Sequence, residues 1–352
     1  MLNKLIIFIG TLQSGGAERV VSEISSMYAG HFQEVVILTY YDMKVFYEID
    51  SRVRLECVEK QTKSRNILKN ALWIRHFVKK EKADTFLSFL LPFNILSIWI
   101  LMFTHTNIVV CERSDPKQVG NKLLRWLRNI SYHFCKKIQV QTSTGKSSFS
   151  SKLQKKILVI PNPNHISLTE RHWALELQKE NRIVTVGRLI PEKNHELLID
   201  AFSILCKDYP QYVLEFYGDG KLKEALRDRI NELGLIDKVV LHGNANDIPR
   251  QIASAKMFVL SSRIEGMPNA LMEAMALGLP CVATDVSGVR DIIEDGENGF
   301  IVPCNDKYQL AEKMKNLLQD PDMMKRFSNK TESVLEKFEK NKIGRLWLEL
   351  VQ

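Results

Sequence analysis

The sequence lacks several features that would assign it quickly to a common class of protein. Its six cysteines are scattered without a CxxC pair, which argues against a zinc site or a disulfide framework and fits a reducing cytosol. They are Cys57, Cys111, Cys135, Cys206, Cys281 and Cys304. No GxGxxG follows the first apolar run, so a nicotinamide site is not expected. Residues 143–148 (STGKSS) resemble the end of a P-loop, but Val140 stands where that motif needs glycine.

Long uninterrupted apolar runs are also absent. The first run has only five apolar residues before Gly10, so no signal peptide is predicted. Residues 86–103 are long enough to cross a bilayer, yet Pro92 and Asn94 divide them. We interpret this segment as a buried strand that runs into a buried helix.

Acidic residues are scarce in the first half of the chain. Residues 1–165 contain 24 Lys and Arg against 12 Asp and Glu, whereas residues 166–352 contain 25 against 29. Such a basic half favours an anionic partner: nucleic acid, acidic lipid or a phosphorylated substrate. A solvated basic face is the alternative interpretation.

What the sequence does contain is a regular alternation of short apolar runs and amphipathic segments. Continuous apolar runs separated by helices are typical of parallel sheets that are covered on both faces. The alternation restarts after a proline-containing, polar stretch at 162–180, and the chain is too long for one core. We therefore predict an α/β fold with two facing Rossmann-like, doubly wound domains and an interdomain cleft that binds ligands. The expected strands lie at 4–10, 34–40, 83–91, 107–112, 137–142, 156–162, 182–188, 212–218, 238–243, 256–262, 279–285 and 299–303.

Each expected domain has a motif directly after its first strand. The motif of the first domain contains two glycines, and the motif of the second contains two cations. Gly15 and Gly16 precede a predicted helix and allow close approach of a phosphate to its N-terminus, although a plain tight turn is the more common explanation of such a pair. Arg188 and Lys193, in GRLIPEKN, straddle a turn at the end of a strand. Two cations at that position can clamp a diphosphate and stabilise a leaving group.

The third motif is SSRIEGMPNALMEAMALGLPCVATD, residues 261–285. Glu265 follows a strand, and Pro268 suits the first position of the next helix. Glu273 lies about 7.5 Å further along that helix. The element therefore offers amides for phosphate, with a carboxylate on either side for hydroxyls, which is the layout of a nucleotide sugar.

The chain resembles the family-four retaining glycosyltransferases of GT-B fold. GGAER, GRLIPEKN, GDGKLKEAL, EGMPNALMEAMALGLPCVATD and SGVRDIIEDGENGFIVP are similar, in this order, to the signature segments of that family. GGAERV and ADTFLSFL look most like bacterial enzymes that add N-acetylgalactosamine, or a related sugar, to undecaprenyl-diphosphate-linked oligosaccharides. The resemblance implies an N-terminal acceptor- and membrane-binding domain at 1–165 and a nucleotide-sugar-binding domain at 166–330. Residues 331–352 are expected to form a helix that crosses back to the first domain.

The resemblance also implies roles for individual residues. Glu265 would bind donor-sugar hydroxyls and Glu273 the ribose, while Arg188 and Lys193 would hold the diphosphate. Donor-binding residues are then expected at Gly15, Gly16, Gly218, Asp219, Gly220, Asn244, Gly266, Met267, Pro268, Asn269, Ala270 and Glu273, and catalytic ones at Arg188, Lys193, Glu265 and Arg113. No metal and no cofactor are implied, because the UDP-sugar is a substrate. Asp320 and Asp322 fit a DxD pattern but lie between two predicted helices, so we interpret them as a capping turn.

One departure from the family concerns Arg113. Many relatives carry a histidine at or near this place, facing the sugar. Arginine cannot act as a general base, but it can stabilise a phosphate or orient the acceptor. The role of the family's histidine is therefore not assigned here.

The predicted function is metal-independent, retaining transfer of a hexosamine, GalNAc or GlcNAc, from a UDP-sugar to a polyprenyl-diphosphate-linked oligosaccharide. The expected location is the cytoplasmic face of the plasma membrane, with an anionic membrane surface and no nucleic acid as partner. Two alternatives stay open: a UDP-sugar 2-epimerase, and a non-catalytic nucleotide-sugar-binding partner of a polysaccharide assembly complex.

The segment 63–82 is the predicted membrane-facing helix. Lys69, Arg75 and Lys79 are expected to meet anionic headgroups or the acceptor diphosphate. An ordinary core-facing helix with a solvated back is the competing interpretation. Its expected apolar side consists of Ile67, Leu68, Ala71, Leu72, Ile74 and Val78.

Overall fold

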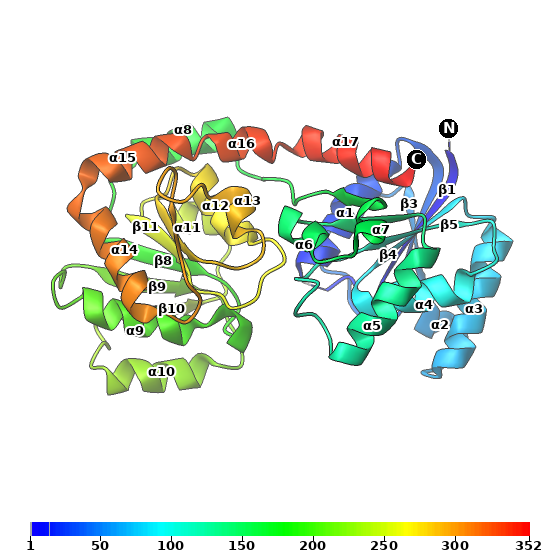
Figure 1. The fold of residues 1–352 in the computed structure, drawn as a ribbon, viewed down its shortest axis with the longest axis horizontal. Helices are drawn as coiled ribbons and strands as arrows, with labels where there is room; N and C mark the ends of the chain where they lie inside the picture. The colour runs from blue at the N-terminus through cyan, green and yellow to red at the C-terminus, as the bar shows by residue number, and fades with distance from the viewer. Residues whose placement is uncertain (1, 14) are drawn as a thin grey trace. The chain divides into compact units, whose positions relative to one another are not determined.

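A computed structural model describes residues 2–13 and 15–352 of the protein. The chain divides into two compact units. Unit one contains the chain up to Asn162 together with Asn341–Gln352, and unit two contains Pro163–Lys340. Figure 1 shows that each unit is a sheet with helices packed on it.

Unit one is built on a seven-stranded parallel sheet with strand order β3-β2-β1-β4-β5-β6-β7. Along β1 successive side chains point to opposite faces, so that Ile6 and Phe8 enter one core and Leu5, Ile7 and Ile9 the other. Its elements are β1 (Leu2–Ile9), α1 (Gly16–Tyr28), β2 (Phe32–Thr39), β3 (Val53–Cys57), α2 (Val58–Thr62), α3 (Ile67–Glu81), β4 (Thr85–Phe89), α4 (Leu91–Leu101), β5 (Asn107–Cys111), α5 (Lys122–Ser131), η1 (Tyr132–Phe134), β6 (Lys137–Val140), α6 (Ser143–Ser147), α7 (Ser151–Gln154), β7 (Ile157–Val159) and α17 (Lys340–Val351).

Unit two is built on a six-stranded parallel sheet with strand order β10-β9-β8-β11-β12-β13. Apolar clusters again cover both faces of the sheet. Its elements are α8 (Leu168–Glu176), β8 (Arg182–Val186), η2 (Pro191–Lys193), α9 (His195–Leu205), β9 (Val213–Tyr217), α10 (Lys223–Glu232), β10 (Val239–Gly243), α11 (Ile248–Ile252), β11 (Met257–Leu260), α12 (Asn269–Ala276), β12 (Cys281–Thr284), α13 (Val289–Ile292), β13 (Phe300–Val302), α14 (Lys307–Gln319), α15 (Pro321–Lys330) and α16 (Ser333–Lys337).

All twelve expected strands are present, and the α/β fold class with two parallel sheets is confirmed. One further strand, β3, was not predicted, and it lies at the edge of its sheet. Arg54 and Glu56 interrupt its apolar pattern, and only Val53 in this strand is buried. A half-exposed edge strand of five residues gives little apolar signal.

The apolar segment 86–103 forms a buried strand followed by a helix, as predicted. β4 and α4 occupy it, and Asn94 is buried, where its amide donates to the carbonyl oxygen of Cys111 at 3.0 Å. Within the described residues we find no helix long and apolar enough to span a bilayer.

The last helix, α17, packs in unit one. Trp347 is buried there and stacks on Phe89 with ring centroids 6.1 Å apart, and Tyr28 Oη donates to the carbonyl oxygen of Trp347 at 2.7 Å. The observed division of the chain falls after Asn162 and after Lys340. The binding roles expected for the two units stay predictions.

Candidate active site

Two of the predicted motifs meet in unit two, where the neighbouring strands β8 and β11 end. Lys193 Nζ donates to Glu265 Oε1 at 2.6 Å, and Ser262 Oγ donates to the same oxygen at 2.7 Å. Only 21% of the Lys193 side chain and 9% of the Glu265 side chain are exposed. Ser261 Oγ donates to the carbonyl oxygen of Lys193 at 3.0 Å, which ties the two loops together. A largely buried, charge-assisted pair of this kind is held in a defined geometry.

Arg188 lies in the same β8 loop but is exposed. Its guanidinium forms no hydrogen bond or ion pair with any described residue, so all five of its N–H groups are available to an anion. The carbonyl oxygen of Arg188 accepts a hydrogen bond from Nε2 of the buried His195, at 3.2 Å. Burial lowers the pKa of His195 to about 4, so its ring is neutral at pH 7.

His195 and Ser262 are residues that the sequence analysis did not assign, although both support the predicted ones. Ser262 stands three positions before Glu265, and His195 directly follows the GRLIPEKN motif. Polar side chains so close to predicted site residues are the signal that could have identified them. Their distances to Glu265 and to the Arg188 carbonyl, however, depend on how the two loops fold.

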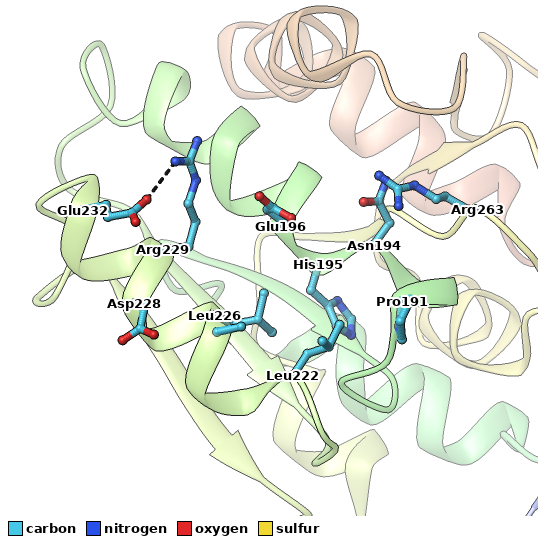
Figure 2. A pocket seen from close by; sticks show the side chains of 11 residues that line it. Pro191, Asn194, His195, Glu196, Leu222, Leu226, Asp228, Arg229, Glu232 and Arg263 are labelled. Atoms are coloured by element: carbon cyan, nitrogen blue, oxygen red, sulfur yellow. Dashed lines mark hydrogen bonds and ion pairs between the residues drawn. The ribbon is translucent and has the colours of Figure 1, made fainter.

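A pocket of about 490 Å³ lies beside the start of α9 (Figure 2). Asn194, His195 and Arg263 line one side of it, and α10 residues line the other. Arg229 is already paired with Asp200 and Glu232. None of the predicted donor-binding or catalytic residues lines this pocket, so it is distinct from the Lys193–Glu265 cluster.

The GDG segment packs directly on the backbone of the Arg188 loop. A Cβ on Gly218, whose φ is +139°, would lie 2.2 Å from the carbonyl oxygen of Gly187. A Cβ on Gly220 would lie 2.5 Å from the carbonyl oxygen of Leu189, and the amide of Leu189 donates to the carbonyl of Asp219 at 2.9 Å. Both glycines are therefore required by close backbone contact. Asn244, the other residue predicted to border the nucleoside, is exposed just after β10.

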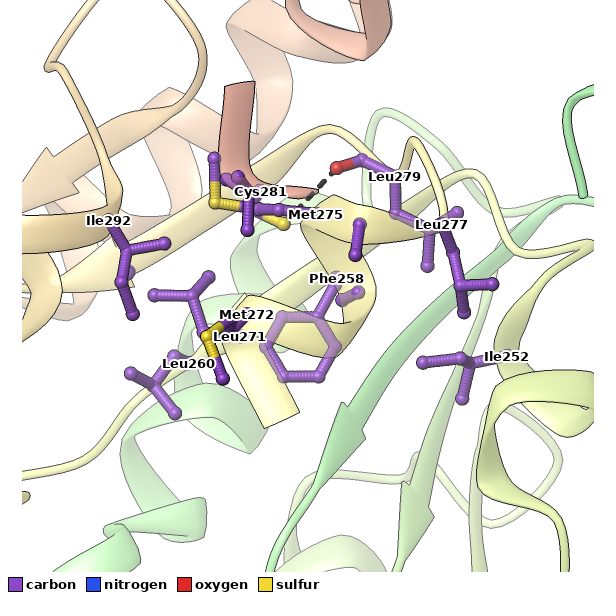
Figure 3. Packing of buried hydrophobic residues seen from close by; sticks show 14 of the residues in the cluster. Ile252, Phe258, Leu260, Leu271, Met272, Met275, Leu277, Leu279, Cys281 and Ile292 are labelled. Atoms are coloured by element: carbon purple, nitrogen blue, oxygen red, sulfur yellow. Dashed lines mark hydrogen bonds between the residues drawn. The ribbon is translucent and has the colours of Figure 1, made fainter. Parts of the chain in front are cut away.

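Helix α12 begins one residue later than expected. Pro268 is its N-cap, with φ −79° and ψ 94°, and the helix covers Asn269–Ala276. Proline offers no side-chain cap to the first-turn amides. Figure 3 shows Leu271, Met272 and Met275 packed among residues of the neighbouring strands, whereas Glu273 is half-buried. The apolar face thus fixes the helix while its start and Glu273 stay accessible.

The segment between Glu265 and α12 is held by close packing. Gly266 and Ala270 are half-buried, and Met267 is buried in the core of unit two. A Cβ on Gly288 would come within 3.0 Å of the Gly266 carbonyl oxygen. The predicted donor-binding residues of this loop are therefore rigidly placed by their neighbours.

Gly15, Gly16 and Arg113 are the predicted site residues of unit one. Tyr47 Oη contacts the backbone amide and carbonyl of Gly15 at 3.2 and 3.1 Å, and α1 begins at Gly16. Arg113 Nη2 donates to Asn162 Oδ1 at 2.5 Å, while its Nε and Nη1 are buried without a partner among the described residues. Burial lowers the pKa of Arg113 to about 10. A charged group with unsatisfied donors is suited to an anionic ligand.

The predicted membrane helix differs from its expectation in two respects. Ile67, Leu68 and Leu72 belong to the expected apolar side of α3 but are exposed, so only part of that side is buried. Arg75 Nη1 donates to the carbonyl oxygens of Ile100 and, at 3.0 Å, Met102, so it caps α4. Lys69 and Lys79 are exposed, as a headgroup contact requires.

Among the described residues, no group of three or more His, Cys, Asp or Glu side chains could hold a metal ion. The expected DxD look-alike caps a helix, because Asp320 Oδ1 accepts from the amide of Met323 at 2.8 Å. Asp320 and Asp322 therefore serve the start of α15 in the observed fold.

Two parallel α/β units, with cations, carboxylates and close-packed glycines at strand ends, define a protein with two Rossmann-like units and a candidate ligand site at the ends of its strands. The model of the family "Glycosyl transferases group 1" matches residues 169–334. An N-acetylgalactosamine-N,N'-diacetylbacillosaminyl-diphospho-undecaprenol 4-alpha-N-acetylgalactosaminyltransferase of Campylobacter jejuni is 30% identical over 366 residues, with 98% of each chain covered. The chain belongs to this glycosyltransferase family and is a hexosyltransferase.

Other relatives and solved structures agree. A second Campylobacter jejuni enzyme, which carries the name GalNAc-alpha-(1->4)-GalNAc-alpha-(1->3)-diNAcBac-PP-undecaprenol alpha-1,4-N-acetyl-D-galactosaminyltransferase, is 29% identical over 99% of this chain and 98% of its own. The structure of HepE from Anabaena with UDP and glucose superposes with a TM-score of 0.80 at 17% identity, covering 98% of both chains. The lipopolysaccharide outer core galactosyltransferase WaaB gives 0.77 at 18%, covering 99% of both chains. The fold is therefore GT-B, as predicted.

Proposed function

We propose that the protein transfers a hexosamine, GalNAc or GlcNAc, from a UDP-sugar to a polyprenyl-diphosphate-linked oligosaccharide with retention of anomeric configuration. The observation that carries this proposal is the Lys193–Glu265–Ser262 cluster beside the unpaired, exposed Arg188. The two Campylobacter relatives, whose names specify undecaprenyl-diphosphate-linked substrates, support the acceptor class.

The proposed chemistry begins at the bond between the anomeric carbon and the diphosphate. That bond breaks, its electron pair leaves with UDP, and Arg188 and Lys193 stabilise the added charge without a metal. The acceptor hydroxyl forms the new bond on the same face, and its proton passes to the leaving phosphate oxygen. Positioning of the two substrates supplies much of the rest of the rate enhancement.

Glu265 and Glu273 have different roles in this proposal. Glu265 binds hydroxyls of the donor sugar, since its carboxylate is fixed by Lys193 and Ser262 and has further lone pairs to offer. Glu273 binds the ribose from the accessible side of α12. Gly218, Asp219, Gly220 and Asn244 border the nucleoside.

Arg113 and the Gly15–Gly16 turn are the contributions of unit one. The buried, unsatisfied Nε and Nη1 of Arg113 suit a phosphate of donor or acceptor. Gly16 is the first residue of α1, and the amides at the start of this helix suit the same kind of group, whereas the Gly15 amide already donates to Tyr47 Oη. We further propose that the enzyme works at the cytoplasmic face of the plasma membrane, where its lipid-linked acceptor would be located.

The first test uses the two cations. Arg188→Ala and Lys193→Ala should each reduce transfer by the equivalent of about 3–4 kcal/mol, as for one lost oxyanion donor. Lys325→Ala, which removes an exposed lysine of unit two, is the matched control and should transfer normally. UDP release is measured with donor and lipid-linked acceptor. Near-normal turnover of Arg188→Ala or Lys193→Ala would exclude the assigned role, and UDP-sugar conversion without any acceptor would indicate the epimerase instead.

The second test separates the glutamates by calorimetry with UDP. Glu273→Ala should weaken UDP binding, because the partner proposed for it is the ribose. Glu265→Gln should leave UDP affinity nearly unchanged and slow transfer, because its partner is the sugar. The amide variant keeps the shape of the side chain beside Lys193. Equal losses of UDP affinity in both variants would contradict the division of roles.

A further inference from the structure

A buried arginine of unit two, Arg171, lies between the ends of two helices that are far apart in the sequence. It belongs to α8, within the polar stretch 162–180 that separates the two alternating halves of the chain. Its side chain is 2% exposed, and α8 buries only one other residue, Ala174. The side of α8 that faces the core therefore carries a guanidinium where an apolar side chain is usual.

The guanidinium of Arg171 caps the C-terminal end of α12. Its Nη1 donates to the carbonyl oxygen of Met275 at 3.3 Å and to that of Ala276 at 3.1 Å. The last carbonyl groups of a helix have no partner within the helix, and a cation beside them interacts favourably with the helix dipole. Arg171 therefore satisfies the end of the same helix whose start and Glu273 are accessible.

The same guanidinium also caps α15. Its Nη2 donates to the carbonyl oxygen of Ser328 at 2.7 Å and to that of Asn329 at 3.4 Å, and its Nη1 donates to Thr331 Oγ1 at 3.0 Å. Ser328 and Asn329 lie in the last turn of α15, and Thr331 is its C-cap. In Figure 1 α8 runs beside α15, as these bonds require. One side chain of α8 thus holds the ends of α12 and α15 together.

Arginine is a costly residue to bury at this position. Its acceptors among the described residues are four carbonyl oxygens and one hydroxyl oxygen, and none is a carboxylate. Removing a charge from water is unfavourable, and an apolar side chain of similar volume is often the more stabilising choice. A guanidinium, however, has N–H groups in fixed directions within one plane. The contacts therefore favour a role in orienting the two helix ends over a role in stability alone.

Helix α12 needs such a constraint because it is short. It has eight residues, Asn269–Ala276, and its N-cap Pro268 makes no side-chain hydrogen bond. The apolar face of α12 packs in the core, but apolar contact is not directional and resists a small rotation or slide of the helix only weakly. Met275 lies two residues after Glu273 in the chain, so a displaced last turn would move the Glu273 carboxylate with it.

We propose that Arg171 is a positioning residue for the donor site. By capping α12 against α15 it sets the rotation and axial position of α12, and thereby the place of Glu273 and of the amides in the first turn. Arg171 is buried and acts only through the helix. The inference rests on the proposed function, in which α12 binds the donor nucleotide.

The test compares two variants of Arg171 with a control that weakens the same unit elsewhere. Arg171→Met removes the charge and keeps a long side chain, whereas Arg171→Lys keeps the charge but not the planar set of donors. Leu317→Ala is the control, because Leu317 is buried in α14 and packs in the cluster on the opposite face of the sheet from α12. Each KM is measured for the UDP-sugar and for the lipid-linked acceptor at a urea-free temperature where denaturation curves show the variant fully folded.

Arg171→Met should raise the KM for the UDP-sugar by about tenfold and leave the KM for the acceptor unchanged, because a small displacement of binding groups has large effects. Arg171→Lys should raise the donor KM by a smaller factor. Leu317→Ala should lose stability without any change in the donor KM. The proposal is overturned by a wild-type donor KM in Arg171→Lys, which decides the matter even if Arg171→Met does not fold. An equal rise of both KM values would overturn it as well, because the disturbance would then not be confined to the donor site.

Hydrogen exchange in the absence of any substrate gives a second measurement. Arg171→Lys should lose protection in α12 more than in β8, whereas Leu317→Ala should not lose protection selectively in α12. Equal losses in α12 and β8 of Arg171→Lys would contradict the positioning role. If the proposed function fails, the wild type itself will release no UDP from donor and acceptor, and exchange in α12 will still report on Arg171. The two failures are therefore distinguishable.

Discussion

The buried His195 allows a quantitative prediction about stability at mildly acidic pH. Its ring is 3% exposed, meets Phe216 edge-on with centroids 5.2 Å apart, and donates through Nε2 to the carbonyl oxygen of Arg188. Burial is the largest cause of its lowered pKa, about 4. In the unfolded chain the pKa returns to its ordinary value of about 6.5.

The sign follows from proton binding. Below the unfolded pKa the unfolded chain takes up a proton that the folded chain excludes, so the contribution of His195 to stability is present above pH 6.5 and is lost as pH falls towards 4. With these two pKa values the loss between pH 7 and pH 5 is about 2 kcal/mol. The loop that carries Arg188 should become less stable in the same range.

The assay follows hydrogen exchange in β8 and α9 in increasing urea at pH 7 and pH 5, after correction for intrinsic exchange rates. Protection there reports the opening of unit two. His195→Gln keeps a side-chain donor but cannot titrate, and should lose about 2 kcal/mol less than the wild type between the two pH values. His172→Gln, at an exposed position of the same unit, is the control. Identical pH dependence in the wild type and His195→Gln would refute the reasoning.

Two further predictions concern packing. Gly218→Ala should destabilise unit two by several kcal/mol and impair UDP binding in calorimetry, because the new Cβ would lie 2.2 Å from the Gly187 carbonyl oxygen. Gly234 also has a positive φ, but a Cβ there would have nothing within 4 Å. Gly234→Ala is therefore the control, which should lose about 1 kcal/mol of stability and bind UDP normally. Trp347→Ala should cost about 3–5 kcal/mol in chemical denaturation of unit one, and a much smaller loss would show that α17 is not part of that core.

The strands and the motifs of the site could be predicted because local rules govern them. Apolar runs specify buried parallel strands, and a polar residue directly after a strand must lie at its carboxyl end. Glu265 and Lys193 were thus placed at the same edge of one sheet, where they form an ion pair. The ion pair between Lys193 and Glu265 could not be predicted, because it depends on how two loops far apart in the sequence fold against each other.

The buried donors of Arg113 show a different limit. A sequence shows which residue follows β5, but burial and hydrogen-bond satisfaction depend on Asn162, which lies far along the chain. The same holds for His195, which directly follows GRLIPEKN in the sequence but whose burial against Phe216 depends on the fold. Local pattern identifies the residue type at a site, and tertiary packing decides its charge state.

Helix α3 shows why a correct helix can be assigned the wrong faces. Ala71, Ile74 and Val78 form the buried stripe, whereas Leu68 and Leu72, four residues apart, form a second stripe that is exposed. Adjacent residues of a helix differ by about 100°, so Leu72 cannot share the face of Ala71. The periodicity of the sequence indicates both apolar stripes, but it does not show which of them is buried in the core and which is exposed. Leu68 and Leu72 on α3 are exposed, as are Trp99 on α4 and Phe103 just beyond it, so unit one presents several large apolar side chains to its surroundings.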